Sequence, residues 1–92
     1  MSRPDLLGPA LRRLRLERDE RQREVAQRAG LTRPMLSNYE RGRRRPSPRN
    51  LAALLQALEA DQTTLHRTMQ RLAALGELAL DAAGLEEVAA DV

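Results

Sequence analysis

The side chains best suited to chemistry in this sequence are arginines and carboxamides crowded between positions 15 and 45. All 16 basic residues are arginine. A guanidinium binds carboxylate or phosphate oxygens through parallel hydrogen bonds, and a carboxamide both donates and accepts hydrogen bonds. The sequence has no cysteine and a single histidine, and it contains no Ser/His/Asp set and no phosphate-cradling glycine loop. We therefore expect an anion-binding protein rather than an enzyme, with no metal and no cofactor.

Charge divides the sequence into halves of opposite sign. Residues 1–49 hold 14 Arg against six acidic residues, whereas residues 50–92 hold two Arg against seven acidic residues. A basic segment joined to an acidic one indicates an anionic partner for the basic half. Genome composition explains the absence of lysine better than selection for bidentate phosphate contacts does.

Hydrophobic spacing predicts that short helices position these side chains. Leu7, Leu11 and Leu14 follow helical periodicity and predict a first helix that ends near Arg18. A second helix begins at Gln22. We expect it to end at a turn containing Gly30, because glycine reaches positive φ without steric cost.

A third helix is expected after Thr32, whose hydroxyl can cap its N-terminus. Its inward face consists of Met35, Leu36 and Tyr39. The outward face at its leading end then comprises Arg33, Pro34, Ser37 and Asn38. We expect Gly42 to end this helix in a left-handed conformation.

Two further helices are predicted in the second half. Ser47 and Pro48 form a helix start, and a leucine stripe follows at positions 51, 54, 55 and 58. Asp61 is expected to cap a fifth helix. Gly76 and Gly84 are expected to interrupt the tail that follows.

Two short helices joined by a tight turn are the helix-turn-helix pattern. The segment resembles the Xre/Cro-type helix-turn-helix family, which includes lambdoid phage repressors and Cro proteins. The positions that carry the resemblance are Gln22, Ala26, Gly30, Glu40-Arg41-Gly42 and Pro46-Ser47. It implies an all-α fold, with a five-helix repressor-like DNA-binding domain over residues 6–65. The tail over residues 66–92 has no counterpart in the motif, and its apolar stripe predicts an additional helical segment.

The joint between the first two helices departs from the family pattern. Family members commonly have Gly, an apolar residue and a Ser or Thr cap there, whereas this sequence has Asp19, Glu20 and Arg21. Asp19 is a candidate for the left-handed conformation or for a cap.

The resemblance also implies roles for individual side chains. Gln22 would contact DNA at a helix N-terminus, and the outward residues of the third helix would read base edges: Arg33, Pro34, Ser37 and Asn38. The arginines after that helix would contact phosphates: Arg41, Arg43, Arg44 and Arg45. Arg15 and Glu40 match family positions that form a structural ion pair. We expect Arg23 and Arg28 to be solvated flanking residues.

The tail is expected to form a dimer interface. A core of about 60 residues buries only about 60% of its unfolded surface, so a partner would add stability. The tail residues without an obvious intrachain partner are Met69, Leu72, Leu75, Leu78 and Ala79. The alternative is a tail that folds back on its own domain.

Together these features predict a sequence-specific regulator that binds double-stranded DNA as a homodimer on a palindromic operator, with repression favoured. Three settings stay open: a phage-type repressor, an antitoxin with a toxin partner, or a restriction–modification controller. A protein-interaction module is the alternative of another class. The sequence lacks a signal peptide and a long apolar run, so we expect a cytoplasmic protein, at a prokaryotic nucleoid or phage-encoded, without membrane contact.

Overall fold

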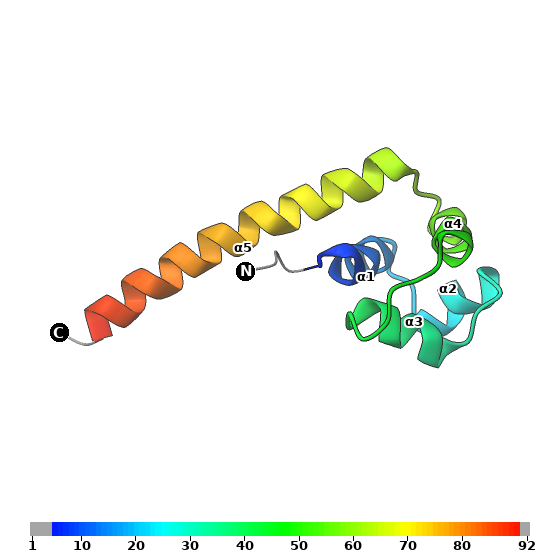
Figure 1. Cartoon of the computed structure of the whole chain (residues 1–92), viewed down its shortest axis with the longest axis horizontal. Coiled ribbons are helices and arrows are strands. Elements are labelled where there is room, and N and C mark those ends of the chain that lie inside the picture. Colours follow the sequence, from blue (N-terminus) through cyan, green and yellow to red (C-terminus); the bar gives the residue numbers. More distant parts are fainter. Residues whose placement is uncertain (1–4, 91–92) are drawn as a thin grey trace.

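Five α-helices and no strand make up the part of the chain that the structure describes (Figure 1). This structure is a computed structural model that describes the backbone of residues 5–90 and the side chains of residues 5–76. The helices are α1 (Leu7–Glu17), α2 (Gln22–Arg28), α3 (Arg33–Glu40), α4 (Pro48–Ala57) and α5 (Gln62–Ala90). The all-α prediction is confirmed.

The core lies where the apolar faces of all five helices meet. The largest side chains with almost no exposed surface are Leu11, Val25, Leu36 and Leu54, which come from four different helices. The rest of the expected inner face of α3 is buried or half-buried, and Leu31 packs against the core from the turn between α2 and α3. The sequence periodicity therefore identified the core correctly.

Side-chain caps begin three of the helices at the predicted residues. The Thr32 hydroxyl accepts a hydrogen bond from the Met35 amide at 3.3 Å, and the Ser47 hydroxyl accepts one from the Asn50 amide at 3.1 Å. The Asp61 carboxylate accepts one from the Thr64 amide at 2.7 Å. Each cap satisfies a backbone donor that has no partner within the first turn of its helix.

The turns use positive φ at glycine and at two other residues. Gly30 and Gly42 have φ of 72° and 73°, and Asp19 and Glu59 have φ of 54° and 52°. The left-handed alternative for Asp19 is therefore confirmed. Helices α1 and α2 meet in a turn held by this residue where related sequences commonly place glycine.

Arg28 is exposed, as expected of a flanking residue, but it also ties this turn to the end of α4, which was not predicted. Its guanidinium pairs with the Glu20 carboxylate and donates a 2.8 Å hydrogen bond to the carbonyl of Ala57. Arg18 also pairs with Glu20, at 3.1 Å. Two guanidiniums on one carboxylate hold the pKa of Glu20 below its ordinary value, with Arg28 the larger cause.

Helix α5 continues without a break from Gln62 to Ala90, so the predicted interruption at Gly76 and Gly84 is wrong. A glycine in a helix interior costs only about 0.5–1 kcal/mol relative to alanine, which neighbouring helical turns can offset. The long helix leaves the other four and extends beyond them (Figure 1). Among the described residues, no helix is long and apolar enough to cross a membrane.

The first turns of α5 pack along α1. Leu65 and Thr68 are buried there, and Met69 and Leu72 are partly buried against the core. The expectation that Met69 and Leu72 lack an intrachain partner is therefore wrong. Helical stripes do not specify which neighbour they cover, and in this chain part of the stripe covers α1.

Candidate nucleic-acid interface

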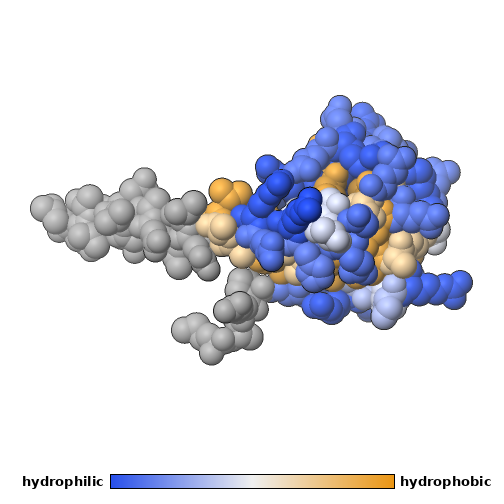
Figure 2. Space-filling view, turned by 90° about the horizontal axis from the view of Figure 1, so that it is seen from above, coloured by the Kyte–Doolittle hydropathy of each residue, from blue (hydrophilic) through white to orange (hydrophobic). Residues whose placement is uncertain are grey.

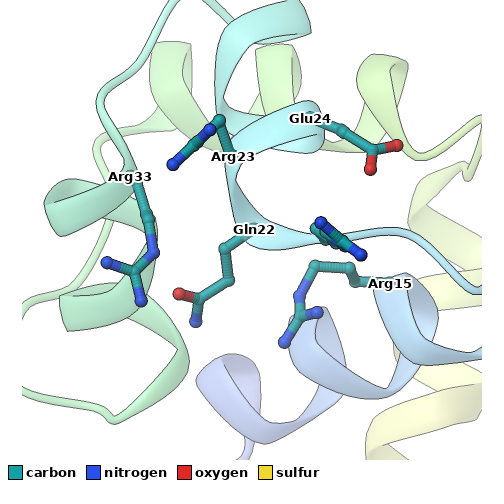
Figure 3. Close-up of a pocket in the computed structure, with 6 residues that line it drawn as sticks. Arg15, Gln22, Arg23, Glu24 and Arg33 are labelled. Atoms are coloured by element: carbon teal, nitrogen blue, oxygen red, sulfur yellow. The ribbon is translucent and has the colours of Figure 1, made fainter.

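The leading ends of α2 and α3 enclose a basic hollow of about 710 Å³, here called the α2 hollow. Its lining residues are Arg15, Arg21, Gln22, Arg23, Glu24 and Arg33. Figure 3 shows Gln22 between Arg33 on one side and Arg15 on the other. Glu40 compensates the charge of Arg15, which leaves three exposed guanidiniums, Arg21, Arg23 and Arg33, against the carboxylate of Glu24. This excess of positive charge makes the hollow suitable for an anion with several charged oxygens.

A second hollow, of about 370 Å³, is lined partly by the same residues. Arg15 and Gln22 line both hollows, and Arg12, Glu40 and Arg41 complete the second. Basic side chains therefore extend from the start of α2 to the end of α3. Arg21 and Arg23 were not predicted as binding residues, since an exposed arginine at a helix start gives no sign in the sequence of what it faces.

The predicted reading face of α3 is open to solvent. Arg33 and Pro34 are exposed, and Ser37 and Asn38 are half-buried. The opposite face, with Leu36 and Tyr39, is buried. A hydrogen bond of 3.0 Å from the Asn50 amide nitrogen to the Tyr39 hydroxyl ties the buried face to α4. Helix α3 is thus held from behind while its polar side chains face outward.

Arg15 and Glu40 form a buried, bidentate ion pair. Arg15 Nε and Nη2 donate to the two Glu40 carboxylate oxygens at 2.7 and 2.9 Å. The side chains are only 11% and 2% exposed. Arg15 Nη1 also donates to the carbonyl of Glu20 at 2.9 Å. The hydrogen bond to Glu40 raises the pKa of Arg15 above its ordinary value, against the opposing effect of burial.

Gln22 joins this pair from the first turn of α2. Its Nε2 donates to Glu40 Oε1 at 3.0 Å. The side chain is half-buried, so it is neither a free solvent-facing glutamine nor part of the core. Three helices therefore meet at one carboxylate: α1 through Arg15, α2 through Gln22 and α3 through Glu40 itself.

The arginines after α3 lie on an exposed loop. The amides of Arg43 and Arg44 donate to the carbonyl of Asn38, at 2.9 and 3.4 Å, and fold the loop back against the helix end. All four predicted phosphate-binding arginines, Arg41, Arg43, Arg44 and Arg45, are exposed. Arg45 additionally forms a 2.7 Å ion pair with Asp5, a long-range contact that sequence spacing could not indicate.

The predicted interface residues of the tail fall into three groups. Met69 and Leu72 pack on the core, and Leu75 is 55% exposed. The side chains of Leu78 and Ala79 lie outside the described residues.

Comparisons with known proteins agree with this arrangement. The helix-turn-helix domain family matches residues 6–68. An uncharacterized HTH-type transcriptional regulator, y4dJ of Sinorhizobium fredii, is 42% identical over 60 residues, which span 65% of this chain and 78% of that protein.

Two solved structures are also similar, and one of them matches over nearly the whole chain. The clp gene regulator ClgR from Corynebacterium glutamicum superposes with a TM-score of 0.83 at 31% identity, covering 96% of this chain and 97% of that one. The restriction–modification controller protein C.AhdI from Aeromonas hydrophila has a TM-score of 0.62 at 34% identity, covering 64% and 89%. The ClgR match includes α5 as well as the compact domain formed by α1 to α4.

Proposed function

Because this chain belongs to the Xre/Cro-type helix-turn-helix family of transcriptional regulators, which are not enzymes, we propose that it binds duplex DNA as a dimer, with α3 in the major groove. One observation carries the proposal. Helix α3 presents polar side chains outward beside a hollow lined by three exposed arginines, while the buried Arg15–Glu40 pair and Tyr39 hold it from behind. An α-helix fits the width of the major groove of B-form DNA.

The outward side chains of α3 suit base edges. Arg33 can donate two parallel hydrogen bonds to guanine, and Asn38 can pair with adenine. Ser37 can reach a base or a phosphate, and Pro34 can contact a thymine methyl group. Gln22 belongs to the same group because it lines the α2 hollow beside Arg33.

The exposed arginines beyond α3 suit the DNA backbone. Arg41, Arg43, Arg44 and Arg45 follow the point where the chain would leave the groove, and they would neutralise phosphates without reading sequence. The acidic half of the chain would then point away from the DNA.

Dimerisation through α5 would complete the regulator. Leu16 and Leu75 are 51% and 55% exposed, the large apolar side chains most open to solvent among the described residues. They come from α1 and α5, which pack together. Figure 2 shows hydrophobic side chains on the flank where the coloured part of the molecule meets the grey atoms, and others between the hydrophilic side chains farther along the same face. Two reading helices about 34 Å apart would then match a palindromic operator.

The genetic setting follows from neighbouring genes rather than from the fold. A methyltransferase gene beside this one would favour a restriction–modification controller, and a toxin gene would favour an antitoxin with a protein partner. A regulator in either setting would act on DNA in the cytoplasm.

The decisive experiment measures affinity for duplex DNA by fluorescence anisotropy at several salt concentrations. A preferred sequence is first selected from a random library. The proposal expects a steep salt dependence and an affinity at least about 10³-fold above that for scrambled DNA. Arg33→Ala should remove much of that preference, whereas Arg67→Ala, an exposed arginine on α5, serves as the matched control. Equal affinity for all sequences would favour the protein-interaction alternative.

A further inference from the structure

One arginine of the loop after α3 differs from the others in its surroundings. Arg45 Nη1 donates to Asp5 Oδ2 at 2.7 Å, and the two side chains are 70% and 49% exposed. Among residues 5–76, no ion pair is formed by the other arginines that follow α3, which are Arg41, Arg43 and Arg44. Within this loop, the protein itself therefore compensates the charge of Arg45.

Asp5 is held at this position through its other carboxylate oxygen. Asp5 Oδ1 accepts a 3.0 Å hydrogen bond from the amide of Leu7, the first residue of α1. An aspartate that accepts from an amide two residues further on forms an Asx turn. One oxygen of the carboxylate is thereby tied to the start of α1, and the other meets the arginine.

The packing of α1 brings this carboxylate to the loop. A Cβ built on Gly8 would lie 2.3 Å from the carbonyl oxygen of Tyr39, so the start of α1 touches the end of α3. The loop leaves α3 at this point, and Pro46, directly after Arg45, is buried. The backbone on both sides of the pair is held by packing, whereas the two exposed side chains are free to exchange partners.

A DNA phosphate would compete with Asp5 for Arg45. A guanidinium binds carboxylate and phosphate oxygens through the same N–H donors. A phosphate that approached Arg45 would also be repelled by the negative charge of Asp5. Exposed ion pairs are weak, whereas a phosphate contact also releases counterions from the DNA. The phosphate should therefore displace Asp5, and the existing pair must break.

We propose that Asp5 is an internal competitor of DNA: its carboxylate occupies on Arg45 the place of a backbone phosphate and weakens binding to duplex DNA of any sequence. This inference rests on the proposed function, because it requires the loop after α3 to lie along the DNA backbone. It assigns to the start of α1 an effect on affinity that does not alter the choice of sequence.

The test is a double-mutant cycle of Asp5→Asn and Arg45→Ala in the full-length protein. Affinities for the selected operator and for scrambled DNA are measured at low salt, where exposed charges are least screened. Asparagine retains an acceptor oxygen for the Leu7 amide and removes the charge. Asp5→Asn should raise the affinity for both duplexes by about 2- to 5-fold, the range that exposed ion pairs reach. In the Arg45→Ala background this gain should disappear.

Glu24→Gln is the matched control. It removes an exposed carboxylate that lines the α2 hollow and forms no ion pair among residues 5–76. Its effect on affinity should be the same with and without Arg45. Asp5→Ala, which also loses the hydrogen bond to Leu7, should show the gain in affinity together with a lower free energy of unfolding in urea. Circular dichroism of each variant checks that the fold is retained.

The outcomes separate this inference from the proposed function. If Asp5→Asn raises affinity equally without Arg45, the carboxylate merely repels DNA at a distance and the competitor role is overturned. An unchanged affinity in the presence of Arg45 also overturns it. Either result leaves the sequence preference and the salt dependence of the wild type intact. If the wild type itself shows neither of these, the proposed function fails and the inference fails with it.

Discussion

At the scale of single residues, the contacts that matter most here join helices far apart in sequence. Arg15 and Glu40 are separated by 25 positions and meet in a nearly dry environment. Gly8 makes a comparable contact without any polar side chain. A Cβ built on it would lie 2.3 Å from the carbonyl oxygen of Tyr39 and 2.8 Å from that of Glu40. Both contacts place α1 against the C-terminal end of α3.

Removing one partner of the Arg15–Glu40 pair should destabilise the protein strongly. A buried charge left without its partner costs about 3–5 kcal/mol. We expect Arg15→Ala and Glu40→Ala each to lower the free energy of unfolding by about that amount in urea denaturation. The exposed pair of Arg13 and Glu17 is the control, and Arg13→Ala should cost less than about 1 kcal/mol. Small and equal losses for all three variants would contradict the importance of burial.

Alanine should be tolerated at one glycine and not at another. Gly8→Ala forces a methyl group onto backbone carbonyls that cannot move freely, and we expect a loss of about 1–3 kcal/mol. Gly76 lies in α5 with nothing within 4 Å of an added Cβ. Gly76→Ala should therefore stabilise the protein by about 0.5–1 kcal/mol. Thermal unfolding of both variants checks the opposite signs, and a stabilised Gly8→Ala variant would refute the close packing.

At the scale of elements, the loop after α3 and the Asp61 cap of α5 have separate functions. The loop that follows α3, here called the arginine loop, contains Arg43 and Arg44. The amides of these two residues donate to the carbonyl of Asn38 and fold the loop back against the helix end, and their side chains remain exposed. The Asp61 cap begins α5, the helix that joins the compact domain to the tail. The loop is expected to affect binding alone, whereas the cap is expected to affect stability alone.

The arginine loop should contribute affinity without sequence preference. Arg43→Ala and Arg44→Ala should each flatten the slope of log affinity against log salt concentration by about 0.9 if one phosphate contact is lost. The preferred sequence should stay the same in both variants. Anisotropy titrations at four or more salt concentrations measure this slope. An unchanged slope in both would leave these side chains as solvated surface residues.

The Asp61 cap should make stability depend on pH in acid. The hydrogen bond from the Thr64 amide lowers the pKa of Asp61 below its ordinary value. A carboxylate with a lowered pKa in the folded state stabilises the protein above the unfolded pKa, and this contribution disappears as pH falls through the folded pKa. Asp61→Ala should therefore unfold at a lower urea concentration than the wild type at pH 7. The difference should narrow below about pH 4.

The substitution Asp61→Asn offers a matched comparison for this cap. Asparagine retains an acceptor oxygen and does not titrate, so the stability of this variant should lie between the wild type and Asp61→Ala at pH 7. A difference between wild type and Asp61→Ala that stays constant from pH 7 to pH 2 would show that the carboxylate charge is not involved.

At the scale of the whole molecule, α5 has two parts with different surroundings. Its first turns pack along α1 as far as Leu72, and Leu75 then faces solvent next to a small cavity of about 60 Å³. A truncation after Leu65 would remove core contacts and confuse folding with dimerisation. A truncation after Gly76 retains the side chains that pack on α1.

The chain that ends at Gly76 should be folded and monomeric if α5 forms the dimer. We expect the full chain to be a dimer by light scattering, and the truncated chain to bind a half-site weakly and lose cooperative binding to a palindrome. Leu75→Glu in the full chain should weaken the dimer because it places a charge in an apolar contact. Gln70→Glu, an exposed change on the same helix, is its control. A truncated chain that remains a dimer with full affinity would move the interface to another surface.

The sequence by itself determined the first four helices, the caps that begin α3, α4 and α5, and the face that α3 leaves outward. Leucine periodicity, Thr32, Ser47 and Asp61 act within a few residues of where they stand, so local spacing is enough to place them. The same applies to Gly30 and Gly42, whose positive φ requires no distant partner.

Only the tertiary structure decided which distant groups meet. Resemblance to a family anticipated the Arg15–Glu40 pair, but not the Gln22 hydrogen bond that joins it. Nothing in the local sequence indicated that Arg28 would reach the carbonyl of Ala57 or that Met69 would cover α1. From the sequence alone, a long arginine side chain or an apolar stripe is compatible with many different neighbours. The packing of the helices selects one of these neighbours, because a buried polar or apolar group must find its partner among whatever surfaces the fold brings within reach.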